Sequence, residues 1–166
     1  NNINRALISV SDKTDLEYLG RELSRFGVEI ISTGGTAKRL RREKIRVLEV
    51  SEYAKYPEIM EGRVKTLQPE IYGGILSIRG NPVHAAQMKK HRMKFIDLVV
   101  VNLYPFETIA AAQKNFDTCI ENIDIGGPTL VRAAAKNHKF VTVIVDPLDY
   151  PRFIEEFKKN DGATTE

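Results

Sequence analysis

Hydroxyl and cationic side chains gather in short segments of this 166-residue chain, some of which also contain paired glycines. One group is residues 9–14, with Lys13 near its end, and a second is Ser32-Thr33-Gly34-Gly35-Thr36. Glycine lets the backbone approach an anion closely, and hydroxyl, ammonium and backbone N–H groups can donate hydrogen bonds to it. Taken singly, the first group is better explained as a helix cap, and the second is explained equally well as a structural turn or as a phosphate site. Together they favour a phosphate, because they follow strands expected to be neighbours.

Two further groups add charges of both signs. Gly62-Arg63-Val64-Lys65-Thr66-Leu67 brings two cations and a hydroxyl together, and alternation in an extended loop would point Arg63 and Lys65 to the same side. In Ile123-Asp124-Ile125-Gly126-Gly127-Pro128, proline suits a first helical turn and the glycines leave amide donors accessible. Solvated surface charge remains an alternative for the first group, and helix capping remains one for Asp124.

Lys136 ends the helix predicted to start near Gly126. From residue type alone, a favourable interaction with the helix dipole is the better explanation of this lysine. A rise of 1.5 Å per residue would carry it roughly 15 Å from Asp124. Both residues can then act on one atom only if the lysine reaches back, the helix is shorter or bent, or another subunit contributes.

Buried strands and amphipathic helices must position these groups. Apolar runs at residues 6–10, 28–31, 47–50, 96–101 and 140–145 predict strands that are buried on both faces. Residues 16–26 and 150–157 have helical periodicity, and Ser11 and Asp12 are candidate caps of the first helix, which Gly27 ends. This alternation predicts a three-layer α/β/α fold with a mainly parallel central sheet.

Two stretches, residues 52–80 and 102–127, interrupt this alternation with glycines and prolines, and we expect them to be irregular and functional. Because loops and helix amino termini gather at the carboxyl ends of parallel strands, the four groups should converge there.

The composition limits the class of protein. Its length and a hydrophobic fraction of 42% fit a single domain over residues 1–166. A net charge of +3, spread along the chain, favours a phosphorylated metabolite over a nucleic acid. No run is long enough to span a membrane, and the amino terminus has no signal-peptide pattern, so we expect a cytoplasmic location and no membrane partner.

Cysteine and histidine usage gives no sign of a metal or a disulfide. The single cysteine, Cys119, excludes an intrachain disulfide and fits a reducing compartment. The histidines are His84, His91 and His138, and they lack the close spacing of zinc ligands. We therefore predict no metal.

Read together, these groups resemble the inosine monophosphate (IMP) cyclohydrolase domain family, which forms one half of a bifunctional purine-biosynthesis protein. The resemblance spans nearly the whole chain. Its most specific parts are residues 62–67, Asn102-Leu103-Tyr104-Pro105-Phe106, and Asp124-Ile125-Gly126-Gly127 with Arg132-Ala133-Ala134-Ala135-Lys136-Asn137. It implies a methylglyoxal-synthase-like fold, a homodimer, no cofactor, and closure of formamido-imidazole-carboxamide ribonucleotide (FAICAR) to IMP and water.

The resemblance also implies roles for particular residues. The catalytic residues would be Lys65, Tyr104, Asp124 and Lys136. The nucleotide contacts would be Ser11, Asp12, Lys13, Thr33, Gly34, Gly35, Thr36, Arg63, Lys65, Thr66, Asn102, Asp124, Ile125 and Gly126.

This sequence departs from the family pattern, which usually has histidine at the position of Gln68 and often at that of Tyr72. Glutamine exchanges no proton near neutral pH, so activity falls if that histidine assists catalysis. The transformylase half is absent, and the polar residues 161–166 stop before the helical remainder of the family domain, which indicates a fragment.

Two alternatives remain. A regulatory module of the same fold, like the effector domain of carbamoyl phosphate synthetase, would bind a nucleotide without transforming it. A methylglyoxal synthase would need histidine among its proton-moving groups, and the four groups contain none.

Overall fold

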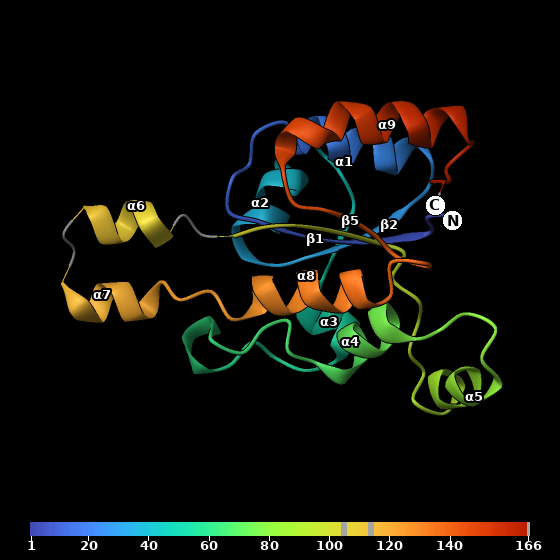
Figure 1. Cartoon of the computed structure of the whole chain (residues 1–166), viewed down its shortest axis with the longest axis horizontal. Helices are drawn as coiled ribbons and strands as arrows, with labels where there is room; N and C mark the ends of the chain where they lie inside the picture. Colours follow the sequence, from blue (N-terminus) through green and yellow to red (C-terminus); the bar gives the residue numbers. More distant parts are fainter. Residues whose placement is uncertain (104–105, 113–114, 166) are drawn as a thin grey trace.

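A parallel sheet forms the centre of the molecule in the computed structural model, which describes residues 1–103, 106–112 and 115–165 (Figure 1). Over these residues the sheet has five strands in the order β3-β2-β1-β4-β5, and every pairing is parallel. The strands are β1 (Arg5–Val10), β2 (Glu29–Ser32), β3 (Val47–Glu49), β4 (Leu98–Asn102) and β5 (Thr142–Ile144).

The predicted strands are confirmed, each within two residues at either end. Their apolar runs pair in register, with Leu7 opposite Ile31 on one side and Val99 on the other. Because helices cover both faces of such a sheet, its central strands carry apolar side chains at successive positions.

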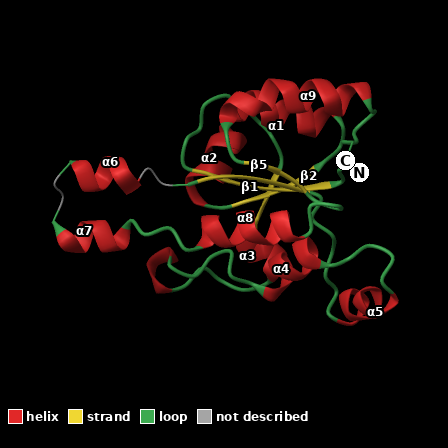
Figure 2. Cartoon of the chain, in the orientation of Figure 1, coloured by secondary structure: helices red, strands yellow, loops and turns green. Residues whose placement is uncertain are grey.

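Helices cover the sheet on both faces and complete three layers (Figures 1 and 2). Helices α1 (Leu16–Arg25), α2 (Gly34–Arg42) and α9 (Tyr150–Lys159) contribute to one buried apolar cluster, together with side chains from one face of the sheet. Helices α3 (Val50–Ala54), α4 (Pro69–Leu76) and α8 (Gly126–Lys136) contribute to the cluster on the other face. The predicted α/β/α architecture is therefore confirmed.

The amino end of α1 differs from its prediction, whereas the carboxyl end agrees. Gly27 has φ +73° and donates its N–H to the Ser24 carbonyl, as expected of a glycine that ends a helix. Ser11 and Asp12 do not cap α1, because its N-cap is Asp15. The Asp12 carboxylate instead accepts hydrogen bonds from Thr14, at 2.9 Å from the backbone nitrogen and 2.7 Å from the hydroxyl.

The two stretches expected to be irregular contain short helices. The first includes η1 (Met60–Gly62) and α4, and α5 (Pro82–Lys90) follows it; the second includes α6 (Phe106–Ala111) and α7 (Phe116–Glu121). The prediction was wrong for α4 because its glycines allow close packing rather than breaking the helix. A Cβ at Gly73 would lie 2.5 Å from Met93 Sδ, and one at Gly74 would lie 2.6 Å from the Lys94 carbonyl oxygen.

Helices α6 and α7 stand away from the sheet as a projecting arm (Figure 1). A further short helix, η2 (Pro147–Asp149), leads into α9. Within the described ranges, no helix is both long and apolar enough to cross a membrane.

Candidate functional site

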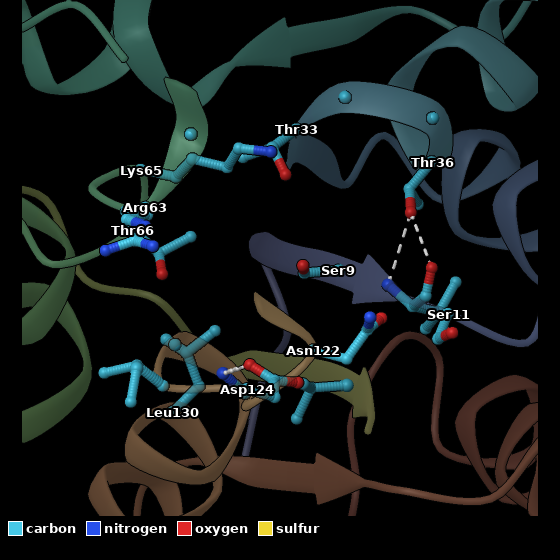
Figure 3. A pocket seen from close by; sticks show the side chains of 18 of the residues that line it. Ser9, Ser11, Thr33, Thr36, Arg63, Lys65, Thr66, Asn122, Asp124 and Leu130 are labelled. Atoms are coloured by element: carbon cyan, nitrogen blue, oxygen red, sulfur yellow. Dashed lines mark hydrogen bonds between the residues drawn. The ribbon is translucent and has the colours of Figure 1, made fainter. Parts of the chain in front are cut away.

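A cavity of about 670 Å³ opens where the strand order reverses, between the carboxyl ends of β1 and β4 (Figure 3). Val10 and Asn102, the last residues of those strands, both line it. In parallel sheets this switch point is the usual place for a ligand. The volume lies within the range of small-molecule sites.

The amino terminus of α2 forms one wall of the cavity. Thr33 is its N-cap residue and makes no side-chain capping hydrogen bond, and the first turn carries no acidic residue. Lys13 approaches this end, with Nζ 3.8 Å from where a Cβ of Gly35 would lie, and Lys65 Nζ lies 3.9 Å from the Cβ position of Gly34. Two ammonium groups and a helix N-terminus therefore converge, which favours an anion such as phosphate.

Hydrogen bonds to the ends of β1 and β4 hold the loop that carries Lys13. The Asn102 side-chain oxygen accepts from the backbone nitrogens of Ser11 at 2.6 Å and Asp12 at 2.8 Å, and its amide nitrogen donates to the Asp12 carbonyl at 3.0 Å. Lys13 Nζ donates to the carbonyls of Val10 and Ser11, both at 3.2 Å. The Asn102 amide group thus anchors the loop at the cavity.

Thr36 lines the cavity but has a structural task. Its buried hydroxyl donates to the Val10 carbonyl at 3.0 Å and lies 3.2 Å from the Val10 backbone nitrogen, which donates to it. These bonds tie the first turn of α2 to the end of β1. They explain why the amino terminus of α2 lies beside the loop that carries Lys13.

The amino terminus of α8 forms the opposite wall, and a carboxylate of the chain occupies it. Asp124 Oδ1 accepts a hydrogen bond from the Gly127 backbone nitrogen at 2.9 Å. A Cβ at Gly127 would lie 2.5 Å from Asp124 Oδ2, so the approach requires glycine. Thr66 completes this wall, with its hydroxyl 2.8 Å from the Cβ position of Gly126.

The loop formed by residues 62–67, which carries Arg63 and Lys65, covers one side of the cavity. Arg63 and Lys65 both line it, but Arg63 has helical backbone angles (φ −63°, ψ −28°), so the alternation expected of an extended loop does not hold there. Each is paired with a glutamate: Arg63 with Glu121 of α7, and Lys65 with Glu58 at 3.2 Å. Glu121 lines the cavity, whereas Glu58 is not among its lining residues.

Most of the residues singled out from the sequence line this one cavity. They are Ser11, Lys13, Thr33, Gly34, Gly35, Thr36, Arg63, Lys65, Thr66, Asn102, Asp124, Ile125 and Gly126. The four groups are therefore neighbours in the folded chain, although more than 100 residues of sequence separate the first from the last.

Two of the expected site residues do not line this cavity. Asp12 is exposed and does not line it, and hydrogen bonds from Thr14 lower the pKa of its carboxyl group. Lys136 is an exposed residue at the last position of α8, the opposite end from Asp124, and does not line the cavity. Tyr104 lies outside the described residues.

Some lining residues gave no signal in the sequence. They include Glu61, Ile120, Glu121 and Asn122. Several belong to α7 or follow it directly, in a stretch where we expected no helix. Only the return of the arm to α8 brings them to the cavity, so no local pattern could have identified them.

The two departures from the family pattern lie outside the cavity lining. Gln68 is buried as the N-cap residue of α4 and makes no side-chain capping hydrogen bond. Tyr72 is half-buried, and desolvation raises the pKa of its hydroxyl, an effect that the Thr129 and Thr66 hydroxyls partly oppose. Neither residue is among those that line the cavity.

The family of the chain follows from comparison with known proteins. A family model described as an MGS-like domain matches residues 15–129. The chain belongs to the MGS-like domain family, in agreement with the parallel sheet and the position of the cavity.

The chain is also similar to curated proteins named bifunctional purine biosynthesis protein PurH. It is 56% identical over 162 residues to the protein from Paracoccus denitrificans and 54% identical over 162 residues to that from Dinoroseobacter shibae. Each match covers 98% of this chain and 31% of the relative, so the chain spans less than a third of their length. The resemblance to the purine-biosynthesis protein is thereby confirmed.

A solved structure has the same fold. The structure titled "Crystal structure of ForH" superposes with a TM-score of 0.82 at 33% sequence identity, covering 98% of this chain and 83% of that one.

Proposed function

We propose that this chain is an IMP cyclohydrolase domain, which closes the second ring of FAICAR to give IMP and water in purine biosynthesis. The observation that carries the proposal is the pairing of two unlike helix N-termini across one cavity. The α2 end, with Lys13, suits the 5′-phosphate. The α8 end, with Asp124, suits the reacting base.

The reaction needs orientation and charge stabilisation rather than a redox group. The carboxamide nitrogen attacks the formyl carbon, and the new ring loses the formyl oxygen as water. One proton of that water comes from the carboxamide nitrogen and one from the formamido nitrogen. An amide is a weak nucleophile and a formamide a weak electrophile, so holding both ends of the substrate lowers the barrier.

Asp124 is the residue we assign to proton transfer. Its Oδ1 accepts from Gly127, which leaves further acceptor capacity on the carboxylate toward the cavity. It can take the proton of the attacking carboxamide nitrogen. Lys65 would supply positive charge to the developing oxyanion, together with the backbone N–H groups near Gly126.

Lys136 does not line the cavity of its own chain, so we infer that it can take part in the reaction only if a second copy of the chain supplies it. It lies at the far end of the 11-residue helix α8. The expected homodimer offers a solution, in which Lys136 of one copy reaches the cavity of the other. Sedimentation of the chain, together with turnover by mixtures of Lys136→Met and Asp124→Asn chains, tests this. Mixed dimers that recover part of the activity support exchange of the lysine between copies.

The central experiment measures IMP formation from FAICAR by ultraviolet absorbance. We expect turnover by the chain and its loss in Asp124→Asn. Calorimetric binding of IMP to the same samples separates catalysis from binding. Turnover undiminished after single replacement of Lys65, Asp124 and Lys136 contradicts the proposed mechanism.

The position of Lys136 favours one alternative, a regulatory module that binds a nucleotide without converting it. Within a single chain the cavity lacks this lysine. IMP binding without any IMP formation, in a sample shown to be dimeric, would favour that module. The transformylase that supplies FAICAR would belong to the remaining length of the PurH relatives.

A further inference from the structure

The loop that presents Lys65 to the cavity is closed at its base by a short antiparallel bridge. Ile59 and Val64 exchange backbone hydrogen bonds of 3.2 and 3.3 Å. Cross-strand neighbours of such a pair also face each other. The bridge therefore sets Glu58 opposite Lys65, and the Glu58 Oε1 to Lys65 Nζ distance is 3.2 Å.

The tip of this loop turns through left-handed backbone conformations. Met60, Glu61 and Gly62 have φ values of +55°, +54° and +90°. Residues other than glycine rarely adopt such backbone angles. These conformations persist only where the surrounding structure holds them in place. The tight turn brings the two sides of the loop close enough for Glu58 and Lys65 to meet.

Gly62 provides the space in which the pair forms. A Cβ at this position would lie 2.6 Å from Glu58 Oε1 and 2.8 Å from Lys65 Cε. Any side chain would push the carboxylate and the lysine stem apart. The glycine of this motif thus has two tasks, a left-handed turn and room for the ion pair.

Glu58 meets Lys65 without entering the cavity. Lys65, Gly62 and Glu61 line the cavity, whereas Glu58 does not. The Lys65 ammonium lies between its glutamate and the α2 N-terminus, 3.9 Å from the Cβ position of Gly34. The carboxylate therefore does not occupy the place of a ligand, in contrast to Glu121, which lines the cavity where it pairs with Arg63.

We propose that Glu58 is a positioning residue, which holds the Lys65 ammonium in the direction of the ligand. Lysine has a long side chain with many rotamers, and fixing one rotamer on ligand binding costs conformational entropy. An ion pair that already holds the side chain in that rotamer reduces the entropy lost when the ligand binds. The proposal rests on the proposed function for its effect on catalysis. Its effect on anion binding does not depend on that function.

The test is a double-mutant cycle on the whole chain, with variants Glu58→Ala, Lys65→Met and both together. We expect Glu58→Ala to lower kcat for IMP formation about tenfold, because a displaced catalytic group loses transition-state contact. In the Lys65→Met background the same change should have no further effect. Glu58→Gln, which keeps an oxygen acceptor without the charge, should fall between Glu58→Ala and the original chain.

Glu43→Ala is the matched control. Glu43 and Glu58 have equally exposed side chains (44%), and Glu43 forms an ion pair of 3.0 Å with Arg21 away from the cavity. This variant should keep both kcat and KM. If Glu58→Ala destabilises the chain in thermal unfolding, the cycle is run with Glu58→Gln.

Binding of inorganic phosphate separates this inference from the proposed function. Glu58→Ala should weaken phosphate binding about threefold in the original chain and not in the Lys65→Met background. If the chain forms no IMP, the proposed function fails, while this binding result still decides the role of Glu58. Equal losses in both backgrounds, or no loss in either, overturn the positioning role.

Discussion

Two helix N-termini, each opening with paired glycines, face the same cavity and differ in what neutralises them. At α2, no acidic residue lies in the first turn, and Lys13 and Lys65 add positive charge to the dipole. At α8, the Asp124 carboxylate already accepts a hydrogen bond from the Gly127 nitrogen. Paired glycines before a helix are therefore not sufficient to identify a phosphate site, because the neighbouring charges decide whether an external anion is needed.

The largest expected effect lies at the α8 end. Asp124→Asn keeps an oxygen that can accept from Gly127 and removes the charge that takes a proton. We expect kcat for IMP formation to fall by about 10²–10⁴, the usual contribution of a general base. The affinity for IMP, measured by calorimetry, should change little. Asp117→Asn, an exposed aspartate of α7 outside the cavity, is the control. A variant that binds IMP more tightly would place the phosphate at α8, because the lost carboxylate would have repelled it.

A cation at the α2 end gives the next effect. Lys13→Met removes one of the two ammonium groups beside Gly34 and Gly35. We expect IMP to bind about 10- to 100-fold more weakly, because a charged hydrogen bond to phosphate contributes roughly 1.5–3 kcal/mol. The salt dependence of the affinity should also decrease. Lys38→Met, on the same helix but outside the cavity lining, should leave both unchanged.

Replacing one glycine of each pair by alanine should change the unfolding free energy differently at the two helix termini. A Cβ at Gly127 would lie 2.6 Å from Leu103 Cδ2 as well as against Asp124, and we expect a loss of about 1–3 kcal/mol in unfolding free energy. A Cβ at Gly35 would make ordinary contact with Lys13 Cε at 3.6 Å. Gly35→Ala should therefore keep the stability within about 0.5 kcal/mol, or raise it. Denaturant unfolding measures both, and equal losses would contradict the difference between the two ends.

The smallest expected effect concerns the ion pair between Arg63 and Glu121, whose side chains are both largely exposed. Glu121→Gln removes the charge that competes with a ligand for Arg63. Because exposed ion pairs contribute about 0.2–1 kcal/mol, IMP affinity should rise by roughly 1.5- to 5-fold. The same change combined with Arg63→Met should have no effect on affinity. Weaker binding in Glu121→Gln alone would mean that the carboxylate contacts the ligand directly.

The strands and the ends of the long helices could be predicted from local patterns. A run such as residues 98–102 is apolar at nearly every position because both faces of its strand are buried. The composition of the run alone is therefore enough to predict a buried strand. The end of α1 at Gly27 and the first turn of α8 at Pro128 follow from backbone preferences that act within a few residues.

The roles of individual polar side chains could not be predicted in this way. Thr36 and Asn102 have the residue types of ligand donors, yet their hydrogen bonds join α2 and the Lys13 loop to strand ends. Asp12 looked like a helix cap and a ligand contact, and its carboxylate turns back to Thr14 instead. Each outcome depends on a partner chosen by the fold rather than by the neighbouring sequence.

By itself, the sequence determined the five strands, the helices α1, α8 and α9, and the four groups that could bind a phosphorylated ligand, because periodicity and backbone preference are local. Tertiary structure alone decided which helix terminus remains open to an anion. It also brought Glu121 from the arm to the cavity and set Lys136 at the far end of α8. The physical reason is that charge acts over distances of a few ångströms in space, and only the folded sheet determines which residues come that close.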